Sequence, residues 1–112
     1  MTFNDDTTTY ARRYSNDGGA DITSINESSI DLTSHSTKPA FSNMFIINNL
    51  ANEKLVIAHL VDQNTAGAGT APNRSEITAK WDNTSSQITK IDIDLSSGNM
   101  GTDTILKVWG SN

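Results

Sequence analysis

The sequence predicts an all-β fold, a small antiparallel β-sandwich, on three observations. In the stretch 89–95 an apolar residue stands at every second position, which is the period of a strand with one face in a core and the other in water. Thr, Ser and Asn occur 14, 13 and 12 times, a composition suited to turns and exposed strand faces. Glu occurs only 3 times, whereas a helical chain of this length would be richer in Glu, Ala, Leu and Lys.

Size and charge limit the classes of function. With 112 residues, 35% of them apolar, the chain is expected to form one domain around a single core. Its formal net charge of -5 argues against nucleic acid as a partner, because binding to phosphates needs clustered Lys and Arg. The lack of cysteine excludes disulfides, thiolate catalysis and Cys-ligated zinc. No apolar run approaches the roughly 18 residues of a membrane span, so membrane insertion is not expected.

Residues 1–19 are expected to be an N-terminal arm, docked onto a single sandwich domain of residues 20–112. If the arm is extended, Tyr10, Arg12 and Tyr14 share one side, where the two tyrosines could stack in a subunit contact or the arm could add an edge strand. The turn at 15–19 offers Asn and Asp oxygens, but their spacing matches no calcium loop. We therefore expect no metal there.

Three apolar stretches follow. Isoleucines and a leucine mark one or two short strands between residues 21 and 33, and 41–49 is apolar on both faces, as in an interior strand. The stretch 53–62 is the most apolar, and its two-sided pattern predicts a central strand, covered on both sides or with its second face at a subunit interface. His59 shares a face with Ile57 and Val61, so we expect a hydrogen-bonded core residue rather than a catalyst.

The stretch 63–72 is predicted to be a long loop. Its Gly67 and Gly69 do not form a phosphate loop, because no Gly-Lys-Ser/Thr and no helix follow. We interpret them as a loop tip that crosses between sheets or lies at a partner surface. Just beyond the loop, Arg74 could pair with Glu76 across a strand edge.

The two tryptophans allow two interpretations each. Trp81 precedes a polar loop, so an exposed indole could stack on a sugar with help from Asn83. It could equally be the large plug that closes one end of a small sandwich, and the shortage of aromatic residues favours the plug. Trp109 carries the same ambiguity and the same preference.

The last part of the chain is predicted to form two strands, 89–95 and 104–109, joined by a glycine-containing loop. Asp92 and Asp94 alternate outward on the first strand, about 7 Å apart by strand geometry, and need only a solvated face as explanation. An enzyme would require an acid and base pair or a nucleophile with its base, and no such arrangement is found. We therefore expect no catalytic residue, no cofactor and no bound metal.

Four pieces of the chain, in order, resemble small β-sandwich modules encoded among the structural genes of tailed phages and related viruses. They are 53–57, the Gly-Ala loop ending in Pro-Asn-Arg within 65–76, the Lys-Trp-X-Asn-Thr-Ser segment of 80–88, and 106–110, which stops at Gly. The resemblance covers about half of the chain, from Glu53 onward. It implies a jelly-roll-like sandwich in a virion, as a capsid decoration, a head fibre or a tail receptor-binding tip. The segment 98–102 differs from the more aromatic loop that we would expect in such a module. The resemblance therefore assigns no receptor-binding residues in this segment.

Together these observations predict a non-enzymatic viral structural protein that assembles as a homotrimer or homopentamer and contacts other virion proteins. The alternative is a carbohydrate- or receptor-binding module at a tail-fibre tip that holds a host surface glycan through Trp81 and adjacent loops. We expect a location in the virion, since a chain without a signal segment would leave the cell by lysis, with cytoplasmic residence as the alternative. The candidate contact residues are Trp81, Asn83, Gly67, Gly69, Arg74, Tyr10 and Tyr14.

Overall fold

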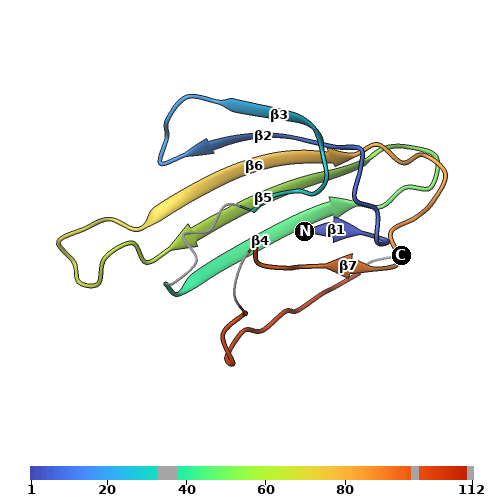
Figure 1. Cartoon of the computed structure of the whole chain (residues 1–112). Coiled ribbons are helices and arrows are strands. Elements are labelled where there is room, and N and C mark those ends of the chain that lie inside the picture. The colour runs from blue at the N-terminus through green and yellow to red at the C-terminus, as the bar shows by residue number, and fades with distance from the viewer. Residues whose placement is uncertain (33–37, 97–98, 111–112) are drawn as a thin grey trace.

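A computed structural model describes residues 1–32, 38–96 and 99–110 and confirms an all-β, sandwich-like fold (Figure 1). The described residues form two antiparallel sheets, one of five strands and one of two, and contain no helix. The strands are β1 (Thr2–Phe3), β2 (Tyr10–Asn16), β3 (Ile22–Glu27), β4 (Ala40–Ile47), β5 (Lys54–Asp62), β6 (Asn73–Trp81) and β7 (Ile91–Asp92).

The larger sheet has the strand order β3-β2-β6-β5-β4, so β3 and β4 form its two edges (Figure 1). Residues 1–19, expected to be an arm docked onto a domain of residues 20–112, supply β1 and β2. Strand β2 pairs with β6 over seven positions, from Tyr10 opposite Trp81 to Asn16 opposite Ser75. Strand β2 of this first segment therefore lies within the larger sheet, between β3 and β6, and β1 lies in the smaller sheet.

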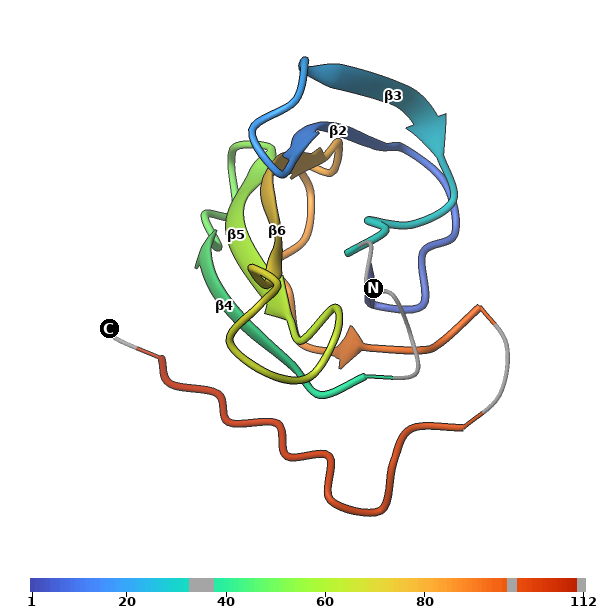
Figure 2. The same ribbon diagram turned by 90° about the vertical axis from the view of Figure 1, so that its left-hand side faces the viewer.

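Alternation along the central strands builds the core. On β5 the side chains of Val56, Ala58 and Leu60 are buried, and on β6 those of Ile77 and Ala79 lie in register beside them. Each intervening β5 side chain is exposed on the opposite face. The five-stranded sheet curls around the N-terminus of the chain, and β7 lies on the open side of the curve (Figure 2). The core therefore sits on the concave face of the larger sheet.

An aromatic cluster closes one end of this core. Trp81 is 1% exposed, with ring centroids 5.8 Å from that of Phe3 and 6.4 Å from that of Tyr10. Its indole Nε1 donates a hydrogen bond of 2.8 Å to Asp6 Oδ2. The buried Lys54 lies 5.8 Å from the ring and donates from Nζ to the backbone oxygens of Asn52 and Asn83, at 2.8 and 2.5 Å. The plug interpretation of Trp81 is the one that this geometry matches.

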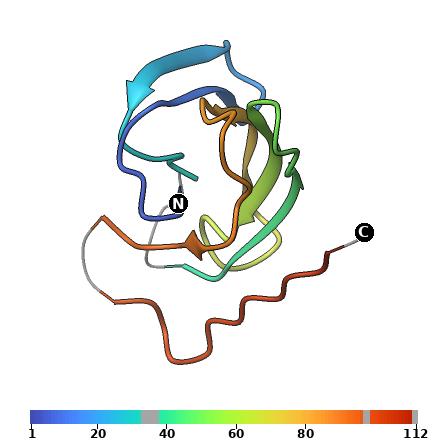
Figure 3. The same cartoon turned by 90° about the vertical axis from the view of Figure 1, so that its right-hand side faces the viewer.

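Three expectations about strands differ from the structure. The expected strand 89–95 is reduced to β7, Ile91–Asp92, whose partner is the two-residue β1. The stretch 41–49, expected to be interior, contains the edge strand β4. Residues 104–109, expected to be a strand, pair with no strand of the described chain, and this segment lies outside both sheets (Figure 3). The preference for Trp109 as a plug was also wrong, because this side chain is 82% exposed.

These differences share a physical cause. Apolar periodicity reports that a segment favours an extended backbone, and it does so from local sequence alone. Strand pairing also needs a second edge whose N–H and C=O groups are unsatisfied. Within the described residues β7 meets only β1, so the ladder stops after two pairs.

Candidate functional site

The feature with most potential for function is an exposed apolar sheet face. Because side chains alternate across a strand, every second residue of β4 and β5 points away from the core. Phe41 and Phe45 on β4 are both 68% exposed, and Ile57 on β5 is 52% exposed. We define the β4–β5 outer face by its eight outward residues, which are Phe41, Asn43, Phe45, Ile47, Leu55, Ile57, His59 and Val61.

The strand register makes this face continuous. Phe41 lies opposite Val61, Phe45 opposite Ile57, and Ile47 opposite Leu55. Directly opposed residues of antiparallel strands have Cβ atoms about 4.5–5.5 Å apart, so each pair is in side-chain contact range. The one polar pair, Asn43 opposite His59, interrupts the row near its middle. Six large apolar side chains on one open face exceed the scattered exposure that soluble surfaces normally show.

A charged row borders this face on β6. Arg74 Nη1 lies 3.7 Å from Glu76 Oε1, so the pair expected from the sequence is present. Lys80 Nζ lies 2.9 Å from Glu53 Oε2, and this hydrogen bond raises the pKa of Lys80 and lowers that of Glu53. An apolar patch with a polar rim is the usual anatomy of a protein contact surface. On its other side the face ends at the free edge of β4.

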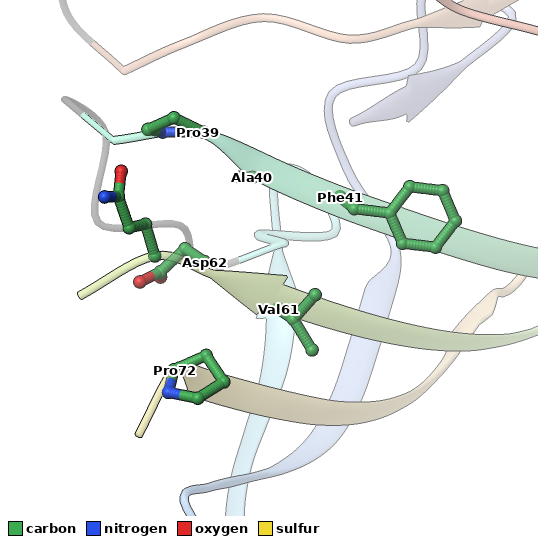
Figure 4. Close-up of a pocket in the computed structure, with 7 residues that line it drawn as sticks. Pro39, Ala40, Phe41, Val61, Asp62 and Pro72 are labelled. Carbon is green, nitrogen blue, oxygen red and sulfur yellow. The ribbon is translucent and has the colours of Figure 1, made fainter. Parts of the chain in front are cut away.

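One end of the β4–β5 outer face is hollowed. A shallow depression of about 320 Å³ lies where β4 begins and β5 ends. Figure 4 shows Phe41 and Val61 side by side on neighbouring strands, with Pro39 and Pro72 at the strand ends. The lining carries little polar surface, so it suits an apolar side chain better than a small polar ligand.

A second depression, of about 490 Å³, lies beside the 63–72 loop. It is lined by Asp17, Asn64, Arg74 and the segment 70–73. Asp17 Oδ1 accepts the backbone N–H of Arg74 at 2.8 Å, and the backbone N–H of Asp17 donates to the oxygen of Arg74 at 3.0 Å. The carboxylate of Asp17 therefore fixes the turn between β2 and β3 to the start of β6.

The expected contact residues fall into two groups at opposite ends of β6. Trp81 and Asn83 lie at and just beyond its last residue, and Arg74, Gly67 and Gly69 lie at its start and in the preceding loop. Nine strand residues separate these ends by about 26 Å. A single ligand site cannot include both groups.

The side chains of the first group, at the end of β6, make their contacts within the sandwich. The 1% exposure of Trp81 leaves no free indole face, and Tyr10 beside it is equally buried. Tyr10 Oη accepts the backbone N–H of Phe3 at 2.7 Å. Asn83 Oδ1 accepts the backbone N–H groups of Ser85 and Ser86, both at 2.9 Å, which shapes the loop after β6. These side chains stabilise the sandwich instead of presenting a surface.

Tyr14 is also directed to the concave face, because it lies opposite the buried Ile77. The guanidinium of Arg12 lies 4.4 Å from its ring centroid, and the same group pairs with Asp31 at 3.1 Å. The stacking partner of Tyr14 is thus found within its own chain.

The two loop glycines are open to solvent. A Cβ atom added at Gly67 or Gly69 would meet nothing within 4 Å. Gly67 has a φ of +96°, a conformation that favours glycine, so its role is in the turn of the β5–β6 hairpin. Both remain accessible to a partner.

His59 and the phenylalanines of β4 were misjudged or missed from the sequence. His59 is exposed on the β4–β5 outer face, so its assignment to the core was wrong. The row of Phe41, Phe45 and Ile47 was not among the candidate contacts. Its signal was the two-sided apolar pattern of 41–49 and 53–62, which was interpreted as an interior strand for 41–49 and, for 53–62, as a central strand or a strand with its second face at an interface.

No group of three or more His, Asp or Glu residues in the described part of the chain is placed to hold a metal ion. Asp92 pairs with Lys90 at 3.2 Å, and Lys90 also pairs with Asp5, so this carboxylate belongs to an ion-pair cluster. The same ranges contain no helix long and apolar enough to cross a membrane.

No protein-family model, no curated protein and no solved structure matches this chain.

Proposed function

We propose that the protein is a non-enzymatic structural component that assembles as a homo-oligomer through the β4–β5 outer face. The observation that carries this proposal is the row of three apolar cross-strand pairs left in solvent. Trimers and pentamers are the assemblies we expect. We place them in a virus particle, as a capsid decoration or fibre component, on the strength of the sequence resemblance alone.

The free energy available from burying the apolar side chains of one β4–β5 outer face is too small to hold an assembly together by itself. Fully burying a large apolar side chain contributes about 1.5–3 kcal/mol, and these six are roughly half exposed, so one face offers about 5–9 kcal/mol. Association costs about 4–15 kcal/mol in lost rotational and translational freedom. One face alone therefore gives a marginal complex. Stable assembly needs apolar surface from both copies.

Glycan binding through Trp81 is not proposed. That alternative needs an indole face open to a sugar ring, and both faces of Trp81 lie inside the aromatic cluster. Replacing Trp81 by Ala would remove a core side chain, so loss of binding by that variant would say nothing about a ligand.

The proposal is tested by placing one charge on the face. In Phe45→Lys a cation would have to be desolvated for the assembly to form, so light scattering after size exclusion should show the 12.1 kDa monomer where the natural chain is oligomeric. The matched control is Ile25→Lys on the opposite edge strand β3, which replaces an apolar residue 71% exposed and should leave the oligomer intact. A natural chain that is monomeric at tens of micromolar, or an unchanged Phe45→Lys oligomer, would refute the proposal.

A further inference from the structure

We propose that the β4 edge of one copy is completed by residues 104–109 of a second copy, which add to it as an antiparallel strand. This inference rests on the self-assembly proposed above and names the segment that makes the contact. It joins two features that the single chain leaves without partners, a strand-like segment and an open sheet edge.

The C-terminal segment, residues 104–109 with the sequence TILKVW, has the pattern of an interior strand. In an extended backbone Ile105 and Trp109 share one side and Leu106 and Val108 share the other, so both sides are apolar. All four side chains are exposed in the single chain, Trp109 most of all. A two-sided apolar strand is normally covered on both faces.

The β4 edge offers matching surfaces. Within the described chain β4 pairs only with β5, so the N–H and C=O groups of its other side face no strand. On its inward side Met44 and Ile46 are only half-buried, although they pack against the core, and on its outward side Phe41 and Phe45 are exposed. One apolar side of an added strand would cover Met44 and Ile46. Its other apolar side would continue the apolar surface that Phe41 and Phe45 begin.

The other edge of the sheet is a poorer acceptor. The outward row of β3 offers one large apolar side chain, Ile25, and beside it Arg13 of β2 forms an ion pair of 3.2 Å with Asp21, which directly precedes β3. Charged groups near an edge oppose strand addition, because docking would desolvate them. We therefore expect the apolar segment 104–109 to add to the β4 edge and not to the β3 edge.

We assign the occupant to another copy because the segment does not pair with the β4 edge of its own chain. Residues 99–110 are all exposed, and the segment lies outside the sheet to which β4 belongs (Figures 2 and 3). At six residues it matches most of the eight-residue β4. Every pairing in the larger sheet is antiparallel, and an antiparallel addition places Trp109 near the start of β4, beside the 320 Å³ depression at Phe41 and Val61.

This contact is head-to-tail, since the donor segment and acceptor edge are different surfaces. Such heterologous contacts close into rings when the rotation between copies permits. A ring of three or five copies would satisfy every segment and every edge. The geometry is thus compatible with the trimer or pentamer expected above.

The decisive experiment mixes two variants that are each defective in one surface. One ends after Gly101 and lacks the donor segment, and the other carries Phe41→Lys and Phe45→Lys and keeps the segment. Each should be a folded monomer alone, with near-ultraviolet circular dichroism of Trp81 retained. Together they should form a 1:1 complex that grows no further, because the segment of the second occupies the intact edge of the first.

Two results would overturn the inference. A truncated chain that assembles to the natural size would show that the face works without the segment, which leaves the proposed function standing. Two monomers that do not combine would show that segment and edge do not meet. A natural chain that is itself monomeric would instead refute the proposed function along with the inference.

A proline variant of the full-length chain and the quenching of Trp109 fluorescence test the role of the segment without shortening the chain. Leu106→Pro with Lys107→Pro in the full-length chain removes an N–H donor on each side of the segment and should weaken assembly by at least about tenfold. Trp109 should become several-fold less accessible to iodide in the natural oligomer than in the monomeric variant. Unchanged quenching on assembly would show that Trp109 stays in solvent and would count against docking of the segment.

Discussion

Among single residues, the two tryptophans show how the same local sequence can lead to opposite environments. Trp81 contacts Phe3 and Tyr10 and binds Asp6, three residues more than 70 positions away in the chain. Its burial in a chain poor in aromatics could be inferred from the sequence. The exposure of Trp109 could not be inferred, because it depends on which strands lie beside the C-terminal segment, and the local sequence does not specify them.

Asp6 ties the N-terminal segment to this cluster. Burial raises the pKa of Asp6, but hydrogen bonds from Trp81 Nε1 and from the backbone and hydroxyl of Thr8 outweigh it, and the net pKa lies below the usual 3.8. The folded chain therefore prefers the ionised carboxylate. The stability that Asp6 contributes is fully present above the unfolded-state pKa and is lost as the pH falls through the lower folded-state pKa.

The variant Asp6→Asn tests this contribution. It keeps one side-chain oxygen but removes the charge, and hydrogen bonds to charged groups are stronger than neutral ones. We expect a loss of about 1 kcal/mol in the free energy of unfolding at pH 7. Below pH 4 the difference from the natural chain should shrink, as the natural carboxylate is protonated. Urea unfolding at pH 7 and at pH 3 measures both values, and a difference that stays constant with pH would contradict the role of the charge.

For whole elements, the sequence predicted the central strand β5 well and the C-terminal strands poorly. The period-two pattern of 53–62 placed Val56, Ala58 and Leu60 on one face and Leu55, Ile57 and Val61 on the other, which the burial along β5 confirms. Which of the two faces is covered depends on β1 and β7, far away in sequence. The interior position expected for 41–49 failed for the same reason, since an edge and a centre differ only in their neighbours.

The small sheet shows an element held more by a side chain than by its ladder. Strands β1 and β7 pair at only two positions. Next to them Asn4 Oδ1 accepts the backbone N–H groups of Thr89 and Lys90, at 2.9 and 3.0 Å, and Asn4 Nδ2 donates to the oxygen of Gln87 at 2.8 Å. The backbone of Asn4 has a φ of 52°, which Asn tolerates better than most residues. This side chain thus continues the pairing where the strands end.

Replacing Asn4 by Ala should therefore release the small sheet. Four hydrogen bonds are lost from a partly exposed site, the three above and one of 3.2 Å that the Thr89 hydroxyl donates to Asn4 Oδ1, so we expect a decrease of about 1–3 kcal/mol in the free energy of unfolding. Hydrogen exchange at the amides of Thr89 and Lys90 should accelerate more than exchange in β5. The control Asn4→Asp retains the accepting oxygens and should lose less. Equal losses in the two variants would assign the effect to backbone conformation instead of to hydrogen bonding.

Across the whole molecule the two sheets are unequal, five strands against two, and the imbalance leaves the sandwich open along β4. Sequence patterns identified enough apolar strand surface for a closed sandwich, including 104–109. They could not show that one chain leaves this segment outside, because that depends on how the strands are connected in space. An open edge and an unused apolar segment in one chain are what the proposed head-to-tail assembly would bring together.

If assembly completes the sandwich, stability must depend on protein concentration. Association stabilises the folded state by mass action, so a tenfold rise in concentration should add about 1 kcal/mol per copy. For a domain of about this size that corresponds to a rise of roughly 4–8 °C in the unfolding temperature. Scanning calorimetry of the natural chain at two concentrations tenfold apart measures the shift. The chain that ends after Gly101 should melt at one temperature at both, because it keeps the fold and lacks the segment that joins copies. An equal shift in the two chains would mean that the copies meet elsewhere, and no shift in either would mean that the sandwich is stable while open.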